Sequence, residues 1–143
     1  MALAVDEAAR EAGCVIQTHS THLVALTLLG VWSDDDILPP LTPYFVMKVG
    51  HVPLVPYHRP GDPRVADLVA ARIAAAAARG VPIRAVMLDR LGPNVWHRTP
   101  GEASAVLEEL EEAARLWLAS ERQALPLSSD AIDELRATFG LDG

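Results

Sequence analysis

The sequence predicts a layered α/β domain, in which helices pack against a central sheet. Segments with strand character alternate along the chain with segments of helical spacing. Half of the 143 residues are hydrophobic, which is enough for one core in a chain of this length. Alanine is abundant and aromatic residues make up only 5%, which favours close-packed helices over a β-sandwich. We expect one domain over residues 1–143, with residues 125–143 as a C-terminal helical tail.

The first elements are a helix, a strand and a second helix. Residues 2–11 have helical character, and residues 14–18 predict a strand because they contain β-branched side chains. Ser20 or Thr21 is a suitable cap for a helix over residues 22–29, which a glycine follows.

Two further strands are predicted after a proline-rich extended segment. Residues 44–49 and 52–57 have strand character, and a Gly-His pair joins them. Pro53 and Pro56 cannot donate a backbone hydrogen bond, so the second of these strands should lie at the edge of the sheet.

The second half of the chain contains the strongest helix signals. Asp62-Pro63 should start a helix over residues 64–79, and residues 83–88 predict a strand after it. Thr99-Pro100-Gly101-Glu102 has the form of a capping box and precedes a long apolar stripe at helical spacing. A last helix is expected over residues 130–139.

Composition excludes several classes of partner. The formal net charge is −7 and the cations are scattered, which argues against nucleic-acid binding. The longest apolar stretch, residues 23–32, is far shorter than the ~20 residues that cross a bilayer. The single cysteine, Cys14, has no internal disulfide partner, and residues 1–10 lack the basic region of a signal peptide. We expect a cytoplasmic protein that binds neither membrane nor nucleic acid.

Several stretches together resemble the class II aldolase/adducin family. They are residues 17–22 (QTHSTH), residues 38–50 (LPPLTPYFVMKVG), residues 53–63 (PLVPYHRPGDP), Gly92-Pro93, and residues 102–118. The middle stretches resemble most closely its 3-oxo-tetronate 4-phosphate decarboxylase branch. The resemblance covers nearly the whole chain to about Ala119 and corresponds to the C-terminal two-thirds of the family domain.

This resemblance implies a three-layer α/β/α domain with a mostly antiparallel sheet, truncated at its N-terminal side. Family members are zinc-dependent lyases, usually tetramers with sites at subunit interfaces. The family's acid/base Glu and its phosphate-binding loop would lie upstream of Met1. The partners implied are other copies of this chain or a full-length relative.

The family's zinc ligands carry over only in part. Three histidines hold the metal in the family, and the matching positions here are Gln17, His19 and Leu91. A leucine has no donor atom, so a complete zinc site is not expected. Asp89 and Arg90 could instead form an ion pair that fills the vacant metal position.

Other candidate site residues each have a plainer interpretation. His22 lies one helical turn beyond His19 and could join a rebuilt metal site or be a hydrogen-bonded core histidine. Tyr44 and Lys48 could build the substrate site or a subunit contact, or could be a packed ring and a solvated charge. Arg59 could hold an anion at the following helix start, or fix the turn.

Three functions stay open. The first is a degenerate, non-catalytic family member without a working metal site and without a cofactor. The second is a zinc-dependent carbon–carbon lyase or decarboxylase acting on a sugar-acid phosphate. The third is a metal-free module that binds a small ligand. All three share one fold, and a fold alone does not choose among them.

Overall fold

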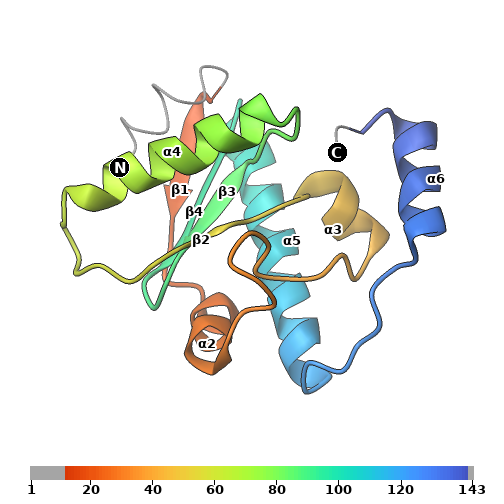
Figure 1. Cartoon of the computed structure of the whole chain (residues 1–143), viewed down its shortest axis with the longest axis horizontal. Coiled ribbons are helices and arrows are strands. Elements are labelled where there is room, and N and C mark those ends of the chain that lie inside the picture. The colour runs from red at the N-terminus through yellow and green to blue at the C-terminus, as the bar shows by residue number, and fades with distance from the viewer. Residues whose placement is uncertain (1–11, 142–143) are drawn as a thin grey trace.

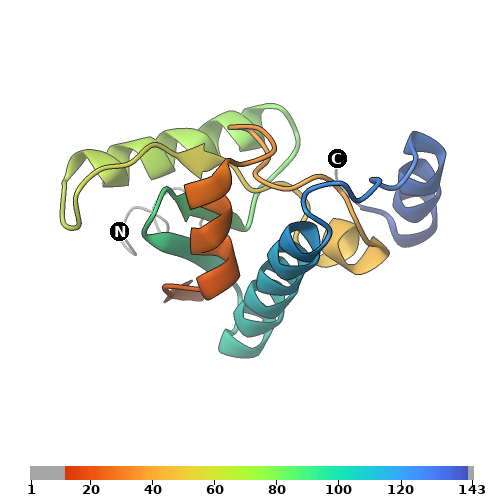
Figure 2. The same ribbon diagram turned by 90° about the horizontal axis from the view of Figure 1, so that it is seen from below.

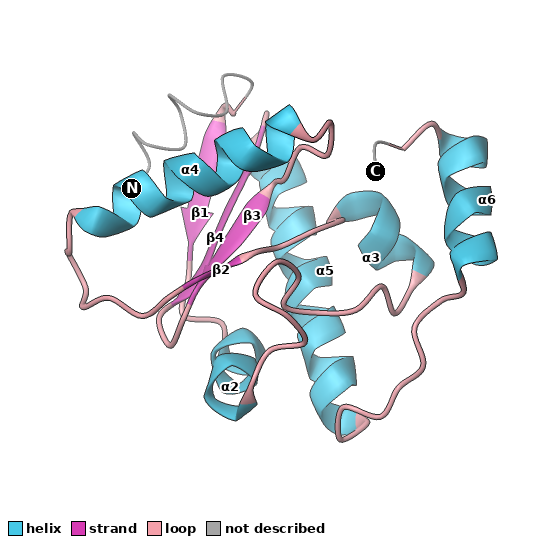
Figure 3. Cartoon of the chain, in the orientation of Figure 1, coloured by secondary structure: helices cyan, strands magenta, loops and turns pink. Residues whose placement is uncertain are grey.

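The computed structural model describes residues 12–141 and contains a four-stranded sheet in the order β1-β4-β3-β2. The strands are β1 (Cys14–Gln17), β2 (Leu54–Val55), β3 (Ala85–Leu88) and β4 (Gly92–His97). Strand β4 is antiparallel to both β1 and β3, whereas β2 runs parallel to β3. The sheet is therefore mostly antiparallel, as the resemblance implied (Figure 3).

Helices cover both faces of this sheet. The helices of the described residues are α2 (Thr21–Leu29), α3 (Pro43–Lys48), α4 (Arg64–Ala78), α5 (Pro100–Ala119) and α6 (Ser129–Phe139), of which α6 lies away from the sheet beside α3 (Figure 1). Helix α4 crosses one face, and α5 packs on the other (Figures 1 and 2). The predicted three-layer α/β/α architecture is confirmed.

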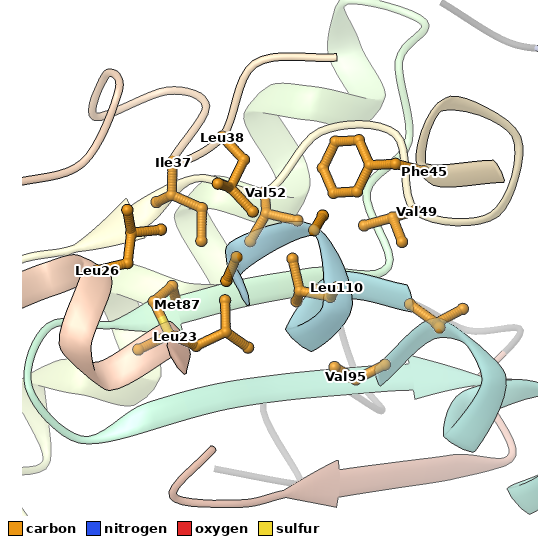
Figure 4. Packing of buried hydrophobic residues seen from close by; sticks show 14 of the residues in the cluster. Leu23, Leu26, Ile37, Leu38, Phe45, Val49, Val52, Met87, Val95 and Leu110 are labelled. Atoms are coloured by element: carbon orange, nitrogen blue, oxygen red, sulfur yellow. The ribbon is translucent and has the colours of Figure 1, made fainter. Parts of the chain in front are cut away.

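Each face of the sheet has its own core. The larger core joins the sheet to α2, α3 and α5, and Leu23, Phe45 and Leu110 are central to it (Figure 4). The smaller core lies between the sheet and α4. Consecutive residues of β4 serve opposite cores, because Val95 belongs to the larger and Trp96 to the smaller.

The strand predicted over residues 44–49 is wrong, since this segment forms helix α3. The Thr42 hydroxyl accepts a hydrogen bond from the Phe45 backbone N–H at 3.1 Å, and Pro43 occupies the first helical turn. Phe45 and Val49, one helical turn apart, are the side chains of this segment that are buried. A mostly apolar run of six residues is compatible with both strand and helix spacing. Here the Thr42 cap favours the helix.

Strand β4 was not predicted, although it is a central strand. Gly92 begins it with a φ of +142°, and a Cβ at this position would lie 1.8 Å from the Thr18 carbonyl oxygen. Only glycine allows this approach between the start of β4 and the end of β1. A Gly-Pro pair is typical of a turn, and only Val95 and Trp96 are apolar after it, so local patterns do not indicate this strand.

The remaining predictions are largely confirmed. Strand β2 lies at the sheet edge, and α4, α5 and α6 begin within two residues of their predicted starts. The helix predicted over residues 2–11 lies outside the described residues. Helix α6 contains no buried residue, and the division into one domain with a tail at residues 125–143 stays a prediction. Within residues 12–141, no helix has the length and apolar character needed to cross a membrane.

Candidate functional site

A pocket of about 470 Å³ opens where β1 ends and β4 begins, beside the start of α4. This volume lies within the range of small-molecule sites. Four residues singled out from the sequence line it, namely Gln17, His19, Arg59 and Leu91. The fold therefore brings together residues 17 and 91, which are far apart in the chain.

Main-chain contacts hold the floor of this pocket. The Thr18 N–H donates to the Pro93 carbonyl at 3.4 Å, and the Gly92 backbone lies directly against Thr18. Nδ1 of His19 lies 2.6 Å from the Leu91 carbonyl oxygen, which accepts its proton. This bond fixes the orientation of the imidazole, and the other ring nitrogen, Nε2, takes no part in it. Histidines in metal sites are oriented in the same way.

The three positions matched to the family's zinc ligands do not fit a zinc ion. A catalytic zinc takes three protein ligands from imidazole, thiolate or carboxylate groups. Here one position is an imidazole (His19), one a neutral amide (Gln17) and one a hydrocarbon (Leu91). In the part of the chain that the structure describes, no three His, Cys, Asp or Glu side chains are grouped to hold a metal.

The pocket contains a buried amide that sequence reasoning missed. Asn94 lies on β4 and is 1% exposed, and its Oδ1 has no hydrogen-bond partner. It is paired with Gln17 on β1 and with Val86 on β3, so these three side chains share one face of the sheet. Asn94 lines the pocket from that face. Predicting β4 would have been necessary to place it there.

The rim of the pocket at the start of α4 is held by an ion pair. The Asp62 carboxylate accepts bonds from the Arg64 guanidinium at 2.7–3.2 Å and from the Arg64 backbone N–H at 2.9 Å. These bonds hold the pKa of Asp62 well below its usual range. Arg59, beside it, is exposed and donates to the Pro60 carbonyl at 3.2 Å. Its positive charge remains available to an acidic ligand.

His22 does not join this site. Its Nδ1 lies 2.9 Å from Oε2 of Glu111 on α5, and it does not line the pocket. The same carboxylate accepts the backbone N–H groups of His22 at 3.1 Å and Leu23 at 3.0 Å. Glu111 therefore caps α2, whereas Ser20 makes no side-chain cap bond. Ser20 is the N-cap residue, as predicted, but Glu111 supplies the side chain that accepts the N–H groups of the first turn.

Other predicted residues lie elsewhere. Tyr44 and Lys48 are on α3 and do not line the pocket; the Lys48 ammonium lies 5.5 Å from the centre of the Tyr44 ring. Their role in a subunit contact stays a prediction. Asp89 and Arg90, both described, form no ion pair with each other. Arg90 takes a φ of 64° in the turn before β4, and its N–H donates to Thr27 Oγ1 at 3.1 Å.

Comparison with known proteins connects this geometry to a family. The model of the class II aldolase and adducin N-terminal domain matches residues 3–118. The 3-oxo-tetronate 4-phosphate decarboxylase of Cupriavidus necator is 57% identical over 137 residues, which cover 91% of this chain and 59% of that protein. The enzyme of the same name from Pectobacterium atrosepticum is 39% identical over 87% of this chain and 55% of its own length.

Solved structures agree with these matches. The crystal structure of YgbL from Escherichia coli superposes with a TM-score of 0.80 at 37% identity, over 94% of this chain and 62% of that one. An L-fuculose 1-phosphate aldolase, at 18% identity and a TM-score of 0.70, shares the fold. The chain spans about three-fifths of the length of the curated relatives it matches. Sequence and structure together show that this chain belongs to the class II aldolase and adducin family.

Proposed function

We propose that this chain acts as a carbon–carbon lyase of the decarboxylase type, with a sugar-acid phosphate such as 3-oxo-tetronate 4-phosphate as substrate. The 57% identity with the Cupriavidus necator decarboxylase supports this substrate class. The observation that carries the proposal is the convergence of His19, Gln17 and Arg59 on one pocket. Because the chain spans about three-fifths of that relative, the proposal concerns what this pocket contributes.

The chemistry of a 3-oxo acid matches these side chains. Decarboxylation breaks the bond between the carboxylate carbon and its neighbour, and the electron pair moves to the oxygen of the 3-oxo group. Carbon dioxide leaves, and the resulting enolate takes a proton from water. Hydrogen-bond donors aimed at the enolate oxygen lower the barrier by stabilising its charge. The Gln17 amide and a protonated His19 can donate such bonds, and the Arg59 guanidinium can bind the acidic group of the substrate.

A decarboxylation assay tests this proposal. The full chain is mixed with freshly generated 3-oxo-tetronate 4-phosphate, and carbon dioxide release is compared with the spontaneous rate, with and without added zinc. We expect release above the spontaneous rate, and His19→Ala should reduce it about 100-fold, the lower end of the range for a lost donor in a preorganised site. Spontaneous-rate release by the wild-type chain under both conditions would refute the lyase.

A second candidate is a family member that binds this ligand class without turning it over. The amide at Gln17 and the hydrocarbon at Leu91 favour it, because neither supplies a tight metal ligand. The decarboxylation assay separates the two candidates, and metal analysis tests whether this chain holds zinc at all. We expect the wild-type chain to hold less than one zinc per chain, and Gln17→His combined with Leu91→His to hold one. Stoichiometric zinc in the wild-type protein would contradict the metal-free interpretation.

Assembly with other copies of this chain, or with a full-length relative, is part of the proposal. Leu28, Leu29 and Trp32, at and after the end of α2, are all at least half exposed. Strand β1 also forms one edge of the described sheet, and open edges favour pairing with another chain. Light scattering of the purified chain should give a mass of two or more times 15.4 kDa, and the resemblance implies four copies.

A further inference from the structure

The unpartnered amide of Asn94 points to a ligand group that the fold itself does not supply. Of the buried side-chain atoms without a partner in the described chain, Asn94 Oδ1 is the one that belongs to this pocket. Leaving a buried amide oxygen unpaired costs about 1–3 kcal/mol. Its neighbours on this face, Val86 and Trp96, are in the smaller core, so a hydrocarbon would suit the fold better at position 94.

An amide oxygen accepts hydrogen bonds, so its partner must be a donor. A hydroxyl is a common neutral donor among ligand groups. Gln17, opposite Asn94 in the β1–β4 register, adds a second amide with both donor and acceptor atoms. Its side chain is exposed to the pocket opening, whereas Asn94 is buried. Together the two amides offer paired contacts to a hydroxylated carbon chain.

The charged side chains at the rim of the pocket indicate the charge of the ligand. Arg59 presents a guanidinium that no carboxylate pairs among the described residues, whereas the nearby Asp62 carboxylate is occupied by Arg64. An acidic group of the ligand is therefore attracted to the Arg59 side, and its hydroxyl groups reach the sheet. A hydroxy acid phosphate of four carbons is well below 470 Å³ in size and fits the pocket.

We propose that this pocket holds a polyhydroxylated acid through the side-chain amides of Asn94 and Gln17 in place of a divalent metal, with Asn94 Oδ1 accepting a hydrogen bond from a ligand hydroxyl. This inference rests on the substrate class of the proposed function. It makes Asn94 a specificity-determining residue, which separates hydroxylated from non-hydroxylated acids of the same length and charge.

The test compares two stable probes by isothermal titration calorimetry on the full chain in EDTA. One is 4-phosphoerythronate, and the other is 4-phosphobutyrate, which has the same acid and phosphate but no hydroxyl. We expect wild-type protein to bind 4-phosphoerythronate in EDTA. Asn94→Leu should weaken that binding about ten-fold and leave 4-phosphobutyrate unchanged. Gln123→Leu, an exposed position away from the pocket, is the matched control and should change neither.

Thermal unfolding of the free variants separates recognition from packing. Asn94→Leu should unfold at the wild-type temperature or above it, because it removes an unpaired buried oxygen. Equal loss of both probes would overturn the role of Asn94. Binding that EDTA abolishes and zinc restores would overturn the metal-free site while leaving the substrate class standing. Failure of both probes to bind under any condition would overturn the proposed substrate class as well.

Discussion

Glu111 and Glu112 are neighbours on α5, yet the structure predicts that removing Glu111 destabilises the fold and that removing Glu112 does not. The Glu111 carboxylate accepts two backbone N–H groups at the start of α2 and the His22 ring nitrogen, at 2.9–3.1 Å. Glu112 instead pairs with Arg115 on the same helix, and both side chains are nearly half exposed. Water replaces the second interaction readily, but not the first.

Glu111→Ala should lower the free energy of unfolding by about 2 kcal/mol. Loss of a helix cap costs about 0.5–2 kcal/mol, and a hydrogen bond to a charged group contributes about 1.5–3 kcal/mol. The Glu111 side chain is 28% exposed, so water can bond the freed N–H groups in part and the loss is smaller than the sum of these two values. For a chain of this length, the change corresponds to a fall in Tm of roughly 4–8 °C.

Urea unfolding followed by circular dichroism measures this difference. Glu112→Ala is the matched control, because it has the same helix propensity change one position away, and it should be indistinguishable from wild type. Glu111→Gln keeps one acceptor oxygen and should fall between wild type and Glu111→Ala. Equal stability of the Glu111→Ala and Glu112→Ala variants would refute the idea that one carboxylate joins α5 to α2.

Three further predictions concern the core, the pocket floor and pH. Leu110→Ala should destabilise the fold by about 2–5 kcal/mol in the same assay, because Leu110 is fully buried in the larger core. Gly92→Ala should cost about 2 kcal/mol or more, since its Cβ would overlap the Thr18 carbonyl, while Gly101→Ala on α5 should not destabilise. Burial, with Arg84 nearby, lowers the pKa of His97 from 6.5. The unfolded chain therefore takes up this proton at higher pH than the folded chain, so stability should fall as pH decreases below 6.5, and His97→Gln should reduce that fall.

Local sequence signals predict an element correctly where one helix cap or one hydrophobic periodicity dominates. The Thr99 hydroxyl accepts the Glu102 N–H at 3.2 Å, as a capping box predicts. The Glu102 carboxylate, however, pairs with His97 on β4 and does not complete the box. The same limit applies to Glu111, whose role depends on a helix that is 88 positions away. Such contacts leave no trace in local spacing.

The sequence also predicts only part of the candidate site. Gln17, His19 and Leu91 could be placed together because they match family positions, and Arg59 because it sits at a strand-to-helix turn. Asn94 could not, because the side-chain alternation of β4 has meaning only once that strand is recognised. A Gly-Pro pair is typical of a turn, and the close approach of Gly92 to Thr18 is a tertiary contact.

The frame of the pocket explains how the family's metal positions can change while the fold stays. The Thr18 N–H, the Pro93 carbonyl, the Leu91 carbonyl and the Gly92 backbone build that frame, and none of these groups depends on which side chain occupies positions 17 and 91. A leucine at position 91 still offers its carbonyl to His19. Substitution at the ligand positions therefore alters what the pocket can bind without a matching loss of stability. Among the described residues that line this pocket, Asn94 is a polar side chain with an unpaired buried atom, and a changed ligand preference should appear there first.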